Sequence, residues 1–133
     1  MKKWAISSLA LSTLLSLPGC LIVADEDDPG APIGTLTVEW TIDGRRDPLD
    51  CVDFGVDRLE LVISGPDEDI EVEPFCEDFA TSLDLYDGRY IGDATLVDSF
   101  DRAATLTEPI DAIDIVAGTE LVVGVDFPVG SFL

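Results

Sequence analysis

The chain has 133 residues, of which 28 are acidic and seven basic, and its formal net charge at pH 7 is −21. This charge repels nucleic acid, which proteins bind through Lys and Arg, and it favours solubility, divalent cations or a basic partner. Residues 20–133 contain no Lys, His, Asn or Gln. These absences exclude histidine-based zinc sites and leave a Ser or Thr nucleophile without its usual general base.

The N-terminal segment 1–19 has the layout of a secretory signal peptide. Lys2 and Lys3 form a basic start, and the stretch that follows is uncharged and rich in Leu, Ala and Ser. A helix that spans a membrane needs about 20 apolar residues, and Pro18 and Gly19 break the uncharged run. The sequence therefore predicts a signal-peptide helix that is cleaved off.

The cleavage region Leu17-Pro18-Gly19-Cys20 resembles the lipobox of bacterial lipoproteins, although Pro18 departs from the usual pattern. The resemblance implies that Cys20 carries a diacylglycerol thioether and an N-acyl group such as palmitate, which together anchor the chain in a membrane. The alternative is an ordinary signal peptide followed by a chance cysteine. Leu21 stands where enteric bacteria place the Asp that retains lipoproteins at the inner membrane, so the resemblance implies the outer membrane.

Residues 20–34 are expected to form the lipidated cysteine and a flexible tether. The acidic run Asp25–Asp28 is followed by Pro29-Gly30-Ala31-Pro32, and neither has a packing pattern. The acidic run resembles a tether that some bacteria use as a signal for export to the cell surface. The alternative is a solvated spacer, so both a periplasmic and a surface-facing location stay open.

From residue 35 the sequence alternates between apolar and polar residues with a period of two, which is typical of half-buried strands. Leu36, Val38 and Trp40 begin this pattern, and we expect Trp40 to face the core. The expected strands are 35–42, 58–63, 70–75, 79–85, 90–97, 105–110, 113–116 and 121–127. Residues 48–54 fit a short helical turn. About seven strands separated by Gly, Pro and Asp turns predict an all-β domain over 35–133, an antiparallel β-sandwich of Ig-like or transthyretin-like type.

The segment Leu85–Tyr90 places a turn glycine two residues before a tyrosine. Asp87 and Gly88 suit a hairpin, because Gly88 tolerates positive φ. Tyr90 can bury its ring while its hydroxyl reaches a backbone carbonyl. The segment resembles carboxypeptidase-regulatory-like, CnaB-type and transthyretin-like domains. The Lys–Asn isopeptide found in many CnaB domains is excluded, because residues 20–133 contain neither residue type.

Cys51 and Cys76 become a pair if Cys20 carries lipid. In an oxidising compartment a disulfide is the default, and closing a loop of about 25 residues would stabilise the fold by roughly 3.5 kcal/mol. The alternative is a reactive thiol, but no neighbouring basic residue in the sequence would lower its pKa.

The acidic clusters are the candidate ligands for a cation. Asp67 and Asp69 lie in one expected loop and Asp87 in another, which makes these three residues the calcium candidates. Neither cluster has the spacing of a known calcium loop, so a plain solvated face is the alternative. Paired carboxylates also serve glycosidases, but a domain of this size has little room for a sugar cleft, and Tyr86 is one of few aromatic residues outside the expected core.

Across most of residues 20–133 the chain also resembles lipoproteins of myxobacterial type. The resemblance rests on the Trp strand Leu36–Ile42, on two cysteines and on the segment Val125–Pro128. That family brings no established activity. We therefore expect a non-enzymatic, lipid-anchored envelope protein without a cofactor, serving as a structural or protein-interaction module. The alternative is a calcium- or carbohydrate-binding β-sandwich.

Overall fold

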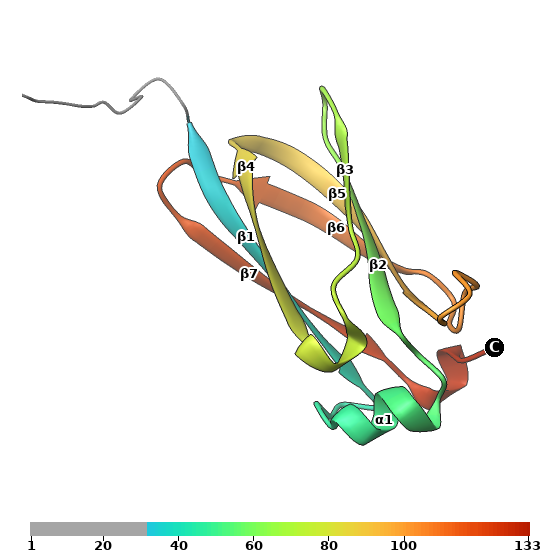
Figure 1. Cartoon of the computed structure of the whole chain (residues 1–133). Helices are drawn as coiled ribbons and strands as arrows, with labels where there is room; N and C mark the ends of the chain where they lie inside the picture. The colour runs from blue at the N-terminus through green and yellow to red at the C-terminus, as the bar shows by residue number, and fades with distance from the viewer. Residues whose placement is uncertain (1–31) are drawn as a thin grey trace, which may run out of the picture. The chain divides into compact units, whose positions relative to one another are not determined.

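Seven strands form two facing sheets in the computed structural model, which describes residues 32–133 (Figure 1). One sheet has the strand order β4-β1-β7, and the other has the order β3-β2-β5-β6. The strands are β1 (Ile33–Ile42), β2 (Arg58–Ser64), β3 (Asp69–Val72), β4 (Ala80–Tyr86), β5 (Gly88–Val97), β6 (Glu108–Ile115) and β7 (Glu120–Phe127). The predicted all-β sandwich of about seven strands is confirmed.

Three short helical segments lie outside the sheets: α1 (Pro48–Asp53), η2 (Cys76–Asp78) and η3 (Val129–Ser131). In residues 32–133 no helix has the length and apolar character needed to cross a membrane. The predicted signal peptide 1–19, the lipidation site Cys20 and the tether as far as residue 31 lie outside the described residues.

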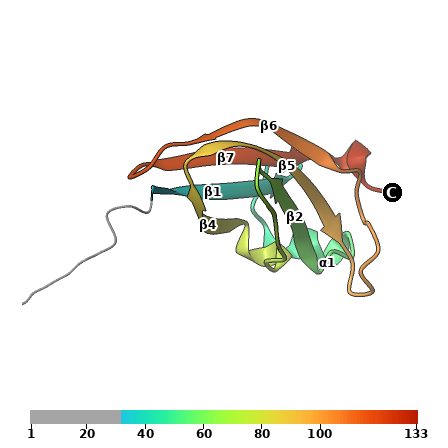
Figure 2. The ribbon, with the colours of Figure 1, turned by 90° about the horizontal axis from the view of Figure 1, so that it is seen from above.

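The core lies between the two sheets, which stack face to face (Figure 2). On β1, Leu36, Val38, Trp40 and Ile42 are fully buried, as the period of two predicts. The same alternation on β2 buries Leu59, Leu61 and Ile63. Each buried side chain of this size contributes about 1.5–3 kcal/mol, so the alternating faces supply the main stabilisation of the sandwich.

One pairing differs from the predicted antiparallel arrangement. Strands β1 and β7 run parallel, with Leu36 opposite Leu121 and Trp40 opposite Val125. The other pairings, β1–β4, β2–β3, β2–β5 and β5–β6, are antiparallel. A parallel pair needs a long connection, so it is formed by segments far apart in the chain and leaves no local signal in the sequence.

The predicted hairpin at Asp87 and Gly88 is wrong. Strand β4 pairs with β1 in one sheet, whereas β5 pairs with β2 and β6 in the other. The turn therefore carries the chain from one sheet to the other, with Gly88 at φ +148°. The Asp87 amide donates to the carbonyl oxygen of Pro32 at 2.7 Å instead of bonding across a hairpin.

The predicted strands 105–110 and 113–116 are not separate, because residues 108–115 form the single strand β6. Tyr90 on β5 pairs with Ile113, and Gly92 pairs with Ile110. Asp111 and Ala112 therefore lie opposite a single residue of β5, which is a β-bulge, and Ala112 has φ +57°. The bulge lets both Ile110 and Ile113 face the core although they are three positions apart. The sequence therefore does not alternate with a period of two here, and its pattern predicts two strands instead of one.

Strand β1 begins before the expected position, at Ile33. Gly34, which the sequence analysis places in the tether, pairs with Leu85 and is buried. A Cβ atom on Gly34 would lie 2.5 Å from the Val116 carbonyl oxygen and 2.9 Å from Cγ2 of Ile115. Gly34 is therefore the place where β1 passes close to the end of β6.

We predict that Gly34→Ala destabilises the domain, because the added methyl group would collide with the Val116 carbonyl oxygen and the Ile115 side chain. Both lie at the end of a paired strand and cannot move away easily. Overpacking of this kind costs about 1–3 kcal/mol, and each kcal/mol lowers the Tm of a domain of this size by about 4–8 °C. Thermal unfolding followed by circular dichroism measures the effect. Gly124→Ala on β7 is the control, because a Cβ there meets nothing within 4 Å. Equal Tm values for both variants would contradict the close approach at Gly34.

Candidate functional site

The disulfide between Cys51 and Cys76 joins α1 to η2, with the two Cα atoms 6.1 Å apart. This bond confirms the predicted pairing and leaves neither thiol free. Both cysteines are buried. The indole Nε1 of Trp40 donates to the Cys76 carbonyl oxygen at 3.1 Å, and Phe79 packs beside the Trp40 ring. The disulfide therefore has a structural role, which is to close the end of the sandwich where β1 stops.

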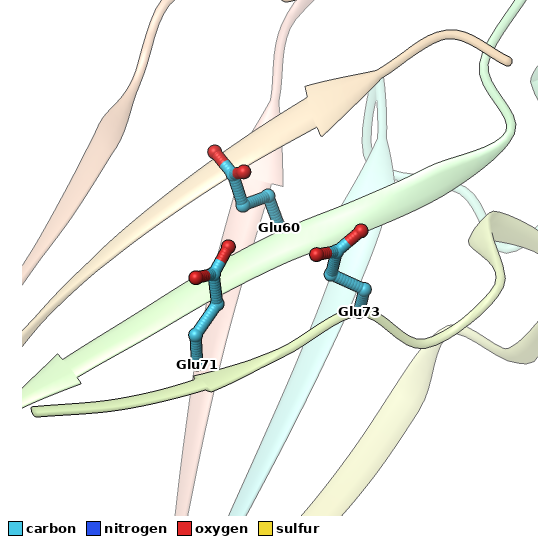
Figure 3. A group of neighbouring side chains, drawn as sticks. All are labelled: Glu60, Glu71 and Glu73. Carbon is cyan, nitrogen blue, oxygen red and sulfur yellow. The ribbon is translucent and has the colours of Figure 1, made fainter. Parts of the chain in front are cut away.

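Three glutamates come together on the outer face of β2 and β3. The carboxylate oxygens of Glu60, Glu71 and Glu73 lie within 4.8 Å of one another. Glu60 lies on β2, Glu71 on β3 and Glu73 just after β3, and their side chains stand on one side of the sheet (Figure 3). The sequence analysis did not predict this group, because only the antiparallel pairing of β2 with β3 brings Glu60 beside Glu71 and Glu73.

The charge of this glutamate group is only partly balanced. Arg58 forms ion pairs with Glu73, Asp57 and Asp101, so one guanidinium serves three carboxylates. Desolvation raises the pKa of Glu60, and its hydrogen bond with Glu71 and the charge of Glu71 raise it further. Glu60 and Glu71 therefore repel each other when both are ionised. Calcium takes six to eight oxygens, so an ion held by this open group would keep several waters.

The predicted calcium candidates take different positions. Asp67 and Asp87 line a common cleft, whereas Asp69 begins β3 and does not line it. Among residues 32–133, the carboxylates that come close enough together to share an ion are those of the glutamate group. Asp67, Asp69 and Asp87 do not form such a set. Asp67 and Asp87 therefore line the cleft without forming a cation site with Asp69.

The cleft has a volume of about 310 Å³ and lies at the end of the sandwich where β1 begins. The turn between β2 and β3 forms one wall, and the connection between β4 and β5 forms the other. Its lining residues are Ile33, Pro66, Asp67, Glu68, Ile70, Asp84, Leu85, Tyr86, Asp87 and Tyr90. Apolar and aromatic side chains thus share this cleft with four acidic residues, and the lining includes no basic residue.

Tyr90 forms part of the cleft in the way its sequence motif predicts. Its ring is buried, and its hydroxyl donates to the carbonyl oxygen of Tyr86 at 2.8 Å. Gly65 lies against the Tyr90 ring, where a Cβ atom would come within 2.4 Å of Cε2 and 2.6 Å of Cδ2. Desolvation raises the pKa of Tyr90, and the charges of Glu68, Asp67 and Asp87 raise it further. These three carboxylates therefore make the electrostatic potential around the Tyr90 hydroxyl negative.

Comparisons with known proteins give information on the fold alone. No protein-family model matches the chain, and none of the curated proteins matches it. The Bacillus anthracis TIE protein has a similar structure, with a TM-score of 0.50 and 12% identity over 73% of this chain. A leucine-rich repeat protein from Bacteroides thetaiotaomicron has a TM-score of 0.39 and 13% identity over 91% of this chain. The chain spans 16% of the length of each of these structures.

We predict that Glu60→Gln stabilises the protein at neutral pH. The folded-state pKa of Glu60 is raised, so its ionisation disfavours the folded state, and this cost appears as the pH rises above the ordinary pKa of a glutamate side chain. Like charges on neighbouring strands destabilise by about 0.2–1 kcal/mol. Urea unfolding at pH 7 should show a gain of this size, which should disappear toward pH 4.

The matched control is Glu77→Gln in η2, which removes the same charge at an exposed position away from the glutamate group. We expect it to change stability by less than Glu60→Gln at pH 7. A gain from Glu60→Gln that is the same at pH 4 and pH 7 would contradict the pKa argument.

Proposed function

We propose that this protein is a non-enzymatic, lipid-anchored protein of the bacterial cell envelope whose β-sandwich serves as an interaction module. The observation that carries the proposal is the segment Leu17–Cys20, which resembles a lipobox and precedes a β-sandwich closed by a disulfide. A disulfide is stable in the oxidising environment to which a secretion signal directs a chain. The absence of Asp after Cys20 supports sorting to the outer membrane.

The chemistry of the cleft supports a role in binding over a role in catalysis. Its ionisable side chains are carboxylates and two tyrosines, Tyr86 and Tyr90. The pKa of Tyr90 is raised, which keeps its hydroxyl protonated at neutral pH and leaves no phenolate to act as a general base. General acid–base catalysis works best when the pKa of the catalytic group lies near the operating pH. A binding surface needs no such group.

We predict that Cys20→Ala moves the protein from the membrane fraction to the soluble fraction of cells and abolishes incorporation of radiolabelled palmitate. The reason is that the acyl chains on Cys20 supply the membrane affinity, at about 0.8 kcal/mol for each buried methylene. Fractionation and labelling of the wild type and the variant measure both effects. The double variant Cys51→Ala/Cys76→Ala is the control and should keep the label. A Cys20→Ala protein that stays in the membrane would contradict the anchor.

A calcium- or carbohydrate-binding module is the second candidate function. The cleft favours it, because Tyr86 and Tyr90 lie there with Asp67 and Asp87. Aromatic rings stack on sugars, and carboxylates bind cations. Neither carboxylate belongs to a close ligand set, which favours the interaction module over a calcium site.

We therefore predict no saturable heat when calcium is titrated into the purified protein, and no rise in Tm in its presence. Exposed carboxylates bind calcium too weakly to shift the folding equilibrium, whereas a site of six to eight oxygens stabilises the folded state by mass action. Isothermal titration calorimetry and thermal unfolding measure the two effects, and magnesium is the control ion. Saturable binding of calcium with a matching thermal shift would favour the second candidate function.

A further inference from the structure

The cleft lies between the free edges of both sheets. Strand β3 is the edge of one sheet and β4 is the edge of the other, and residues of both line the cleft. Among residues 32–133, no further strand pairs with the outer side of β4 or β3. An unpaired edge presents backbone N–H and C=O groups to which an extended peptide can bind by adding a strand.

The negative charge of the cleft is not balanced by the described part of the chain. Its five arginines all form ion pairs with carboxylates. None of these pairs includes Asp67, Glu68, Asp84 or Asp87. The Asp84 carboxylate accepts a hydrogen bond from the Thr35 hydroxyl. Asp67, Glu68 and Asp87 lie close enough to Tyr90 for their charges to raise its pKa. A positive charge that neutralises these three must come from outside residues 32–133.

The shape and lining of the cleft indicate which cation fits. Its volume of about 310 Å³ is much larger than a bare metal ion requires, and it is at the lower end for small-ligand sites. The side chains of Ile33, Ile70 and Leu85 offer an apolar surface, which suits the methylene stem of a long basic side chain. The exposed ring of Tyr86 can stack on a cation.

The geometry points to this cleft as a docking site for a lysine or arginine side chain on an extended segment of a partner protein. The inference rests on the proposed function as an interaction module and specifies the chemistry of the partner. The stem of the basic side chain lies on the apolar surface of the cleft, and its head meets Asp67, Glu68 and Asp87. The segment that carries it runs along the free edge of β4.

The N-terminal part of this chain is a less suitable occupant, although Ile33 lines the cleft. The segment Asp25–Asp28 is entirely acidic and would meet like charges there. A second copy of the sandwich would also bring a large excess of acidic residues. Charge complementarity therefore favours a basic partner of a different sequence.

The test uses the chain as purified from the expressing cells, in a neutral detergent. The probe is the peptide acetyl-Thr-Val-Lys-Val-Thr-amide, and its reference is the same peptide with norleucine in place of lysine. We expect saturable binding of the lysine peptide in isothermal titration calorimetry, weaker at 500 mM than at 50 mM NaCl because salt screens the charges. We expect little binding of the norleucine peptide.

Two matched pairs of variants locate the binding. Asp67→Asn/Asp87→Asn should weaken binding of the lysine peptide by roughly three- to tenfold, because two charge pairs are lost. Asp53→Asn/Asp78→Asn removes the same net charge from exposed positions in α1 and η2, and should change the affinity less than twofold. Tyr86→Ala should weaken binding of the lysine peptide, whereas Tyr86→Phe, which keeps the ring, should bind it about as well as the wild type. All variants should unfold at temperatures close to the wild type, since these side chains are exposed.

Several outcomes would overturn the inference. Equal weakening by the two aspartate pairs would show that net charge alone attracts the peptide. Equal affinity for the norleucine peptide would show that no cation is recognised. An absence of binding to either peptide, with palmitate labelling of Cys20 intact, would reject this docking site while leaving the proposed envelope location in place.

Discussion

Acidic residues at alternate positions along the strands determine how each strand can lie. Glu39 stands between Val38 and Trp40, and Glu60 stands between Leu59 and Leu61. A slip of one residue in register would turn every side chain of a strand to the opposite face and bury these carboxylates. Burying an unpaired charge is very costly, so only one register is stable. Among the described residues, Asp50 is the only buried acidic residue, and Arg45 pairs with it at 2.8 Å.

The same constraint concentrates negative charge on the outer surface, and the strand pairings decide where it collects. The pairing of β2 with β3 brings Glu60 close to Glu71 and Glu73, and Arg58 balances only part of their charge. At the other place, the chain turn after β2 and the crossing after β4 bring acidic residues to the rim of an apolar cleft. The first is an open face, whereas the second is a cleft of about 310 Å³ in which acidic and apolar side chains lie together.

The sequence analysis could find the features that local patterns encode. The alternation located the buried faces of β1 and β2, and the motif around Gly88 predicted the buried ring of Tyr90 and its bond to a backbone carbonyl. The parallel pairing of β1 with β7 and the passage from β4 to β5 between sheets depend on contacts between distant segments. The glutamate group and the cleft depend on those same contacts, so no local pattern reveals them.

The two ends of β1 have different roles. At its C-terminal end, the Cys51–Cys76 disulfide and the bond from Trp40 fix the chain, while at Ile33 the cleft opens. Ile33 lies thirteen positions after Cys20 in the sequence, and an extended chain spans at most about 3.5 Å for each position. With Cys20 anchored as proposed, Ile33 stays within about 45 Å of the bilayer surface. A partner that reaches the cleft would therefore present its basic segment close to the membrane. A partner held at the same membrane would meet the cleft more readily than one that diffuses in from solution.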